Sequence, residues 1–220
     1  MWDNQTIMMI VEGTGATLYM TLVSTLIAYA LGLPLGIVLV VTAPGGLKPN
    51  KIVFKILDVV VNIVRSIPFL ILLMLIIPFT RFIVGKSYGA TATIVPLAIA
   101  AAPFVARLVE SSLLEVDHGV IEAAQSMGAD NWTIIWKVLV AEARTSLIVG
   151  ATISLGTILG YSAMAGVVGG GLGDIAIRYG YHRYQADIMI VTVVLLVALV
   201  QILQMIGTRL SRKLDRRITR

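Results

Sequence analysis

The residues that could carry covalent or metal chemistry are few in this sequence. Cysteine is absent, and the two histidines are His118 and His182. Thiol nucleophiles, disulfides and cysteine-based metal sites are therefore excluded. No apolar segment holds the cluster of histidine and carboxylate groups that an enzyme inside a membrane would need. We therefore predict no catalytic residue and no metal site.

A short stretch resembles the end of a phosphate-binding loop. Gly85, Lys86 and Ser87 follow the order of that motif, but position 80, where the motif needs a further glycine, is threonine. The sequence thus contains no complete phosphate-binding motif, and we interpret the match as a coincidence.

The stretch from Glu122 to Val138, EAAQSMGADNWTIIWKV, predicts two short helices that meet at a glycine. Gly128 is typical of a left-handed helix stop, and Asp130 or Asn131 can cap the second helix. Apolar residues recur at helical spacing on both sides of the glycine. They are Val116, Val120, Ala123 or Ala124 and Met127 before it, and Trp132, Ile135, Trp136 and Leu139 after it.

Such a bent helix pair has three possible uses. It could fit a groove in a soluble partner, or it could be an interfacial loop whose tryptophans lie at the lipid headgroups. It also has the outline of a DNA-binding helix-turn-helix. Long apolar segments flank it, however, and the basic residues do not gather on a soluble face, so we expect no nucleic-acid partner.

The elements around this pair are those of a membrane protein. Of the 220 residues, 58% are hydrophobic and 13% are charged, and the mean hydropathy is +0.93. A span needs about 20 apolar residues as helix, and the runs are continuous rather than alternating, which excludes a membrane β-barrel. We predict an all-α protein, one domain over residues 1–220, with five transmembrane helices near 15–41, 57–79, 90–113, 145–168 and 187–208.

The basic residues indicate the orientation of these helices. Twelve Lys and Arg residues fall in the first and third connections and the tail, and four fall in the other two connections. The positive-inside rule then places the N-terminus outside and the C-terminus in the cytoplasm. No Lys or Arg precedes Lys48, so the first apolar run lacks the basic region of a secretory signal and should stay in the mature protein.

Some residues within the spans suggest packing or function. Two glycine pairs, Gly32 with Gly36 and Gly156 with Gly160, allow close helix approach; we prefer packing within the chain over a dimer seam. Arg65 is an intramembrane charge, and therefore either a functional group or, as we favour, a side chain that reaches the cytoplasmic headgroups. Arg107 and Glu110 are three residues apart and could form an ion pair.

The bent helix pair also resembles the cytoplasmic signature of permease subunits of ATP-binding-cassette importers. That signature is Glu-Ala-Ala, three residues, Gly, nine residues, Ile, any residue, Leu-Pro. Here Glu122-Ala123-Ala124 and Gly128 match it, while Val138, Val140 and Ala141 replace Ile, Leu and Pro. Without proline at 141, the second helix can continue toward Glu142. The segments NIVRSIPFLILL, IPFTRFIVG, AAPFVARLVE and GYSAMAGVVGGGLG resemble the methionine-importer permeases, over roughly residues 15–210.

The resemblance implies a type I importer permease fold in a bacterial cytoplasmic (inner) membrane. It implies one half of a pore formed with a second copy, two cytoplasmic ATPase subunits that bind ATP and Mg, and an external substrate-binding protein. The chain would be a transport subunit rather than an enzyme, coupled to the ATPases through a loop at about 115–143, which we call the coupling loop. Its coupling residues would be Glu122, Ala123, Ala124 and Gly128.

Several alternatives stay open. Glu122 could form a salt bridge to the ATPase, as we favour, or be a charge in the first turn of a helix. The cargo could be another amino acid or a short peptide instead of methionine. An ion-coupled carrier that works without an ATPase would need further charges at mid-membrane.

Met164 is the one long, flexible thioether within Tyr161 to Gly170, a run otherwise rich in Gly, Ala, Ser and Val. Two copies could meet on a dimer axis and close the path as a gate, because methionine fills irregular gaps. The alternative is an ordinary lipid-facing or core methionine.

Overall fold

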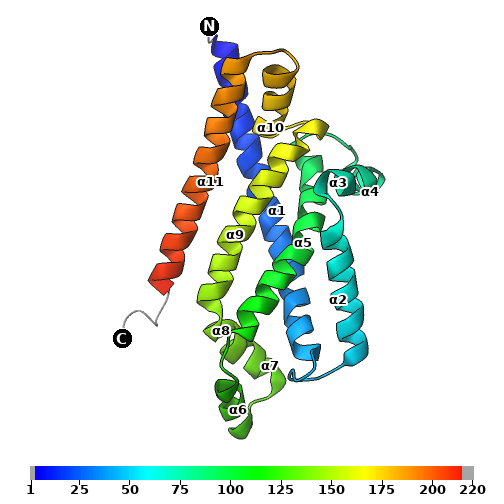
Figure 1. Cartoon of the computed structure of the whole chain (residues 1–220), viewed down its shortest axis with the longest axis vertical. Coiled ribbons are helices and arrows are strands. Elements are labelled where there is room, and N and C mark those ends of the chain that lie inside the picture. Colours follow the sequence, from blue (N-terminus) through cyan, green and yellow to red (C-terminus); the bar gives the residue numbers. More distant parts are fainter. Residues whose placement is uncertain (1–2, 215–220) are drawn as a thin grey trace.

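The computed structural model describes residues 3–214, and these residues form helices and connections without a β-strand. Five long helices run side by side along the molecule (Figure 1). They are α1 (Asn4–Thr42), α2 (Lys51–Ser66), α5 (Ala90–Leu114), α9 (Arg144–Met164) and α11 (Ala186–Leu214). The all-α prediction is therefore confirmed. Four helices are long and apolar enough to cross a membrane, or five if α2 and the next helix form one bent span.

The second span, predicted near 57–79, is broken within that range. α2 begins at Lys51, where the Asn50 side chain accepts hydrogen bonds from two backbone N–H groups, and it ends at Ser66. α3 (Phe69–Leu75) then departs at 101°. The break lies at Pro68, because the proline ring disfavours helical geometry at Ile67, which is extended (φ −79°, ψ 123°). The α4 helix (Ile77–Val84) follows and ends at Gly85.

The α1 helix is longer than the predicted span at 15–41, and it packs along α5. It begins after Asp3, whose side chain accepts a hydrogen bond from the Gln5 N–H. Gly32 and Gly36 make the contact possible, because a Cβ atom at either position would stand 2.7 Å or less from a backbone carbonyl oxygen of α5. For this pair, the prediction of packing within the chain is confirmed.

The second glycine pair differs from the first. A Cβ atom at Gly156 would lie 3.1 Å from the Gln204 side chain of α11, whereas at Gly160 no atom lies within 4 Å. The prediction of packing within the chain is therefore wrong for Gly160. It lies on an exposed side of α9.

The connection from α9 to α11 is folded back onto α1. It consists of a 3-10 turn (Ala165–Val168), the short helix α10 (Gly171–Ile175) and a π-helical turn (Ala176–Tyr181). The Leu172 N–H donates a hydrogen bond to the Thr17 hydroxyl at 2.8 Å, and both residues are buried. This connection therefore closes the end of the bundle at which α1 begins (Figure 1).

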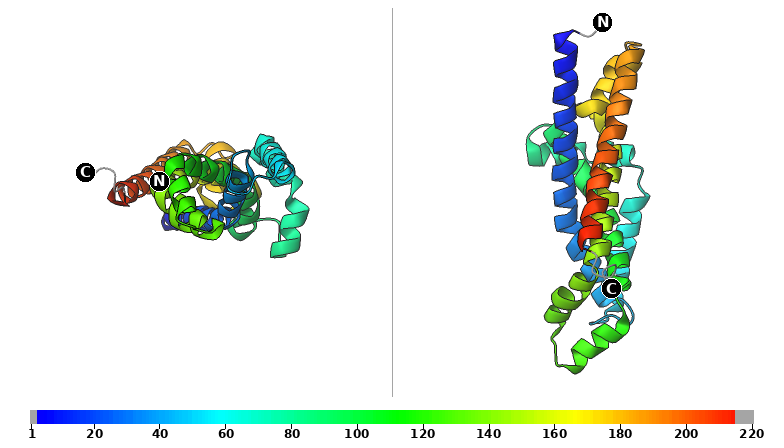
Figure 2. Two further views of the ribbon diagram at one scale, coloured as in Figure 1. Left: turned by 90° about the horizontal axis from the view of Figure 1, so that it is seen from below. Right: turned by 90° about the vertical axis from the view of Figure 1, so that its left-hand side faces the viewer.

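The coupling loop extends beyond the opposite end of the bundle (Figures 1 and 2). It contains α6 (His118–Ser126), α7 (Asn131–Thr133), a π-helical segment (Ile134–Leu139) and α8 (Val140–Glu142). The turn between α1 and α2 lies at the same end, and α11 runs toward it (Figure 1). Viewed along the bundle, α2 to α4 lie on one side and α11 on the other (Figure 2).

Candidate functional site

The hinge of the coupling loop is a helix stop built around Gly128. This residue has φ +79°, in the left-handed region that glycine adopts without strain. The Gly128 N–H donates to the Gln125 carbonyl at 2.9 Å, and the Ala129 N–H donates to the Ala124 carbonyl at 3.1 Å. These two bonds form the pattern that commonly ends a helix at glycine. The predicted left-handed stop is therefore confirmed.

The second half of the coupling loop forms one helical run from Asn131 to Glu142. Asp130 occupies the N-cap position, and interaction with the Thr133 side chain lowers the pKa of its carboxyl group. The helical run passes through Ala141 and ends at Glu142, so the expected continuation in place of a proline break is confirmed.

The coupling loop exposes apolar side chains around its hinge. Met127 is 82% exposed and Trp132 is 68% exposed. Val120 and Trp136 are also exposed, and the two tryptophan rings meet edge to face with centroids 5.7 Å apart. Such a cluster at the tip of a projecting element suits contact with another molecule. The predicted apolar stripes therefore face outward in part, instead of packing wholly against the bundle.

The other face of the coupling loop belongs to the core of the protein. Ile134 and Leu139 are completely or almost completely buried, and they join Ala124 and Val116 in the cluster that also contains residues of α1 and α5. Because protein cores are packed to crystal-like density, a displacement of the coupling loop must move the helices to which it is packed.

The predicted coupling residues are divided between these two faces. Glu122 and Ala123 are exposed, whereas Ala124 is buried beneath them. The Glu122 carboxylate lies 3.2 Å from His118 Nδ1, one turn earlier in α6. With a side chain 67% exposed, Glu122 is accessible to a partner. Glu122, Ala123 and Gly128 thus lie together on the projecting surface, and Ala124 anchors it.

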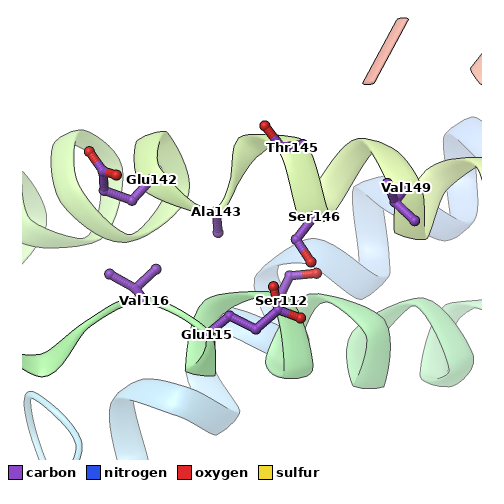
Figure 3. A pocket seen from close by; sticks show the side chains of 8 residues that line it. All are labelled: Ser112, Glu115, Val116, Glu142, Ala143, Thr145, Ser146 and Val149. Carbon is purple, nitrogen blue, oxygen red and sulfur yellow. The ribbon is translucent and has the colours of Figure 1, made fainter. Parts of the chain in front are cut away.

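A cavity of about 230 Å³ lies where the coupling loop joins α9. Ser112 and Glu115, at the end of α5, face Ser146 on the first turn of α9 (Figure 3). Within residues 3–214, the structure brings together no group of three His, Cys, Asp or Glu side chains that could hold a metal ion. The cavity lies between the end of α5 and the start of α9.

An ion-pair network connects α2 with α5 inside the bundle. The Arg107 guanidinium contacts the Glu110 carboxylate at 2.6 Å, which confirms the predicted pair, and it also contacts the Asp58 carboxylate. A further bond of 3.0 Å joins Arg107 to the Asn62 side-chain oxygen. Sequence reasoning missed Asp58, which lies 49 residues before Arg107. The signal that could have found it is its place on one helix face with Lys55 and Asn62.

Met164 lies at the end of α9 and is 50% exposed. This exposure excludes the core alternative for its side chain. It shares one face of α9 with Gly160, where the chain leaves open space. The structure places neither residue near the coupling loop, which lies at the other end of the bundle (Figure 1).

Comparison with known proteins decides the family. Residues 32–220 match the family described as binding-protein-dependent transport system inner membrane component. The chain belongs to this family. The prediction of a permease-type transport subunit, rather than an enzyme, is thereby confirmed.

Relatives of this inner membrane component include named methionine permeases. The probable D-methionine transport system permease protein MetI of Vibrio cholerae is 54% identical over 210 residues, which cover 95% of this chain and 93% of that protein. The MetI protein of Escherichia coli is 51% identical over 158 residues, 72% of this chain and 73% of its own length.

Solved structures agree with these relatives. A chain of the MetNI methionine ABC transporter in inward-facing conformations has a TM-score of 0.96 and 48% identity, with 98% of this chain and all of that chain covered. A chain of an amino acid ABC transporter crystallised with histidines has a TM-score of 0.72 at 20% identity, covering 99% of both chains, and shares the fold.

Proposed function

We propose that this inner membrane component is one of two identical halves of the pore of an ATP-driven methionine importer. Two cytoplasmic ATPase subunits drive it, and an external binding protein delivers the cargo. The observation that carries this proposal is the coupling loop, whose hinge exposes Met127 and Trp132 while Ile134 is buried in the core. One surface of the coupling loop thus can contact a partner, while the opposite surface transmits a movement of the loop to the spanning helices.

The proposed mechanism is rigid-body alternating access. When the two ATPases close on ATP, they draw the two coupling loops together. Each loop is packed on α1 and α5 through one apolar cluster, so the spanning helices follow and the cavity changes from inward-open to outward-open. Glu122 contacts the ATPase by charge, and Met164 of each copy closes the path at the axis in the resting state.

The proposed orientation places the coupling loop in the cytoplasm of a bacterial cell, with the N-terminus outside. Two observations support it. Lysines and arginines are concentrated in the two connections at the coupling-loop end and in the last turns of α11, which runs toward that end. The α1 helix begins at the opposite end of the bundle (Figure 1).

The test is reconstitution of the chain with its ATPase partner and binding protein in lipid vesicles. We expect uptake of labelled methionine that requires ATP, and competition by unlabelled methionine that exceeds competition by other amino acids or short peptides. Stronger competition by another solute would assign the pore to that cargo. Uptake without the ATPase would favour an ion-coupled carrier, which no observation on this structure supports.

A further inference from the structure

The α2 helix carries an uninterrupted polar face along its whole length. Residues on this face are spaced four, three, four and three apart, which confines them to about 80° of the helix circumference. They are Lys51, Lys55, Asp58, Asn62 and Arg65. Valine and isoleucine side chains are exposed on the opposite side of the helix, as lipid contact requires. A polar stripe in a spanning helix faces water, a cavity or protein instead of lipid.

Arg65 is the deepest charge on this polar face. It lies 14 residues after Lys51, which corresponds to about 21 Å of helix, within a hydrocarbon layer about 30 Å thick. This distance favours a functional charge within the span over a side chain that reaches the cytoplasmic headgroups. Arg65 is exposed, and among residues 3–214 it has no ion-pair partner. The Asp58 carboxylate, two turns nearer the cytoplasm on the same helix, already forms an ion pair with Arg107.

The break between α2 and α3 lies directly beside Arg65. Ser66 and Pro68 are exposed there, and the chain turns by 101°. Non-helical backbone at membrane depth is tolerated where it is buried in protein or lines a water-filled cavity. The carbonyl groups at the end of α2 lack the next helical turn as partner. An exposed break and an unpaired guanidinium therefore coincide at one place on the same face.

We propose that the polar face of α2 lines the aqueous translocation path, and that Arg65 binds the carboxylate of the passing amino acid there. This inference rests on the proposed function and adds a cargo contact to it. A guanidinium offers two parallel N–H donors that match a carboxylate. The cargo is zwitterionic, so its carboxylate must find a cation when it leaves the external binding protein. Of the cations on this face, Arg65 lies furthest from the coupling-loop end of α2, beside the break in the span, and it has no ion-pair partner among residues 3–214.

The proposed translocation path is tested by comparing how fast a water-soluble thiol reagent reaches the two sides of α2. The chain has no cysteine, so Asn62→Cys on the polar face can be compared with Val60→Cys, on the opposite side at nearly the same depth. In the idle reconstituted complex, a charged, water-soluble methanethiosulfonate reagent should modify Asn62→Cys at least tenfold faster than Val60→Cys. Equal or slower modification of Asn62→Cys, or its direct disulfide with the second copy, overturns the path.

Transport by charge variants tests the role of Arg65. Arg65→Met keeps an unbranched, flexible side chain and removes its charge. We expect methionine uptake at least tenfold below wild type, with ATP hydrolysis still stimulated by the loaded binding protein. Uptake by Arg65→Lys should lie between that of Arg65→Met and wild type, because lysine keeps the charge but not the two parallel donors. Wild-type rates of uptake in Arg65→Met overturn the carboxylate contact. If Arg65→Met does not assemble, Arg65→Gln is measured against the same outcomes.

Failure of the proposed function and failure of the Arg65 path would give different experimental results. A wild-type complex that takes up no methionine contradicts the proposed function, whatever the cysteine variants show. A wild-type complex that transports methionine while Asn62→Cys resists the reagent contradicts the further inference alone.

Discussion

Gly36 of α1 lies directly against Val109 of α5, so that a Cβ atom at Gly36 would stand 2.7 Å from the Val109 Cβ atom. The same added atom would stand 2.6 Å from the Ala106 carbonyl oxygen. Because backbone cannot move aside as a flexible side chain can, this contact sets the distance between the two helices. It is therefore a sensitive point for the stability of the bundle.

We expect Gly36→Ala to destabilise the protein by about 1–3 kcal/mol, the usual cost of overpacking. Thermal unfolding of the purified permease in detergent measures this. Gly15→Ala is the matched control, because it lies on the same helix with no atom within 4 Å of its added Cβ, and alanine raises helix propensity by up to about 1 kcal/mol. Equal stability of the two variants would show that the helices separate without cost.

Gly128→Leu should leave the permease inserted but abolish transport and weaken ATPase binding. A side chain in the left-handed region costs about 1 kcal/mol or more, and among residues 3–214 no atom lies within 4 Å of a Cβ added at Gly128. The substitution therefore disturbs the backbone geometry of the hinge and the surface of the coupling loop that meets the ATPase. Pull-down of the ATPase and uptake in vesicles measure both effects.

Gly128→Asn is the control for this hinge, since asparagine tolerates left-handed geometry better than other side chains. It should retain more transport than Gly128→Leu. Normal uptake by Gly128→Leu at normal abundance would contradict the coupling role.

Met164→Ala should raise passive methionine leak through the idle complex without raising ATP hydrolysis. The physical reason is that a shorter side chain leaves a hole where two methionines close the axis. Met205→Ala is the control, because Met205 on α11 is equally exposed, at 51%, and should not affect the leak. Vesicles of both variants are loaded with labelled methionine, and its escape is followed.

A second measurement on the same residue tests its position. Met164→Cys should cross-link to its twin in the second copy when the transporter rests without ATP. If no such dimer forms and Met164→Ala vesicles stay as tight as wild type, the gate belongs to other residues.

Removing the Arg107 cation should destabilise the contact between α2 and α5. Arg107→Met leaves the Asp58 and Glu110 carboxylates without their shared partner, and we expect a loss of about 1–3 kcal/mol, below the range for fully buried pairs because the Arg107 side chain is 20% exposed. Combining it with Asp58→Asn should restore part of the loss. Strictly additive effects in this double-mutant cycle would contradict the network.

The orientation is tested with single cysteines in intact cells. Lys48→Cys, in the turn between α1 and α2, should resist a membrane-impermeant thiol reagent, and the exposed Tyr181→Cys should react. Lys48 is substituted instead of Gly45 in the same turn, because the Gly45 φ of +90° would strain any side chain. The reverse pattern of labelling would place the coupling loop outside the cell.

The sequence by itself determined what depends on near neighbours in the chain. The bent helix pair at Gly128 was predictable because helix stops are formed by residues within one turn. The Arg107–Glu110 pair was predictable because residues three apart share a helix face. The spanning helices followed from apolar run length, which a bilayer imposes on any chain.

Only the tertiary structure decided which helix face meets which. Gly32 with Gly36 and Gly156 with Gly160 have the same spacing, yet the first pair is packed tightly and Gly160 faces open space. Asp58 joins Arg107 across 49 residues of chain, and at Pro68 a run long enough for one span becomes two helices that meet at 101°. Spacing fixes the direction of a side chain on its own helix, whereas its partner depends on how the helices assemble.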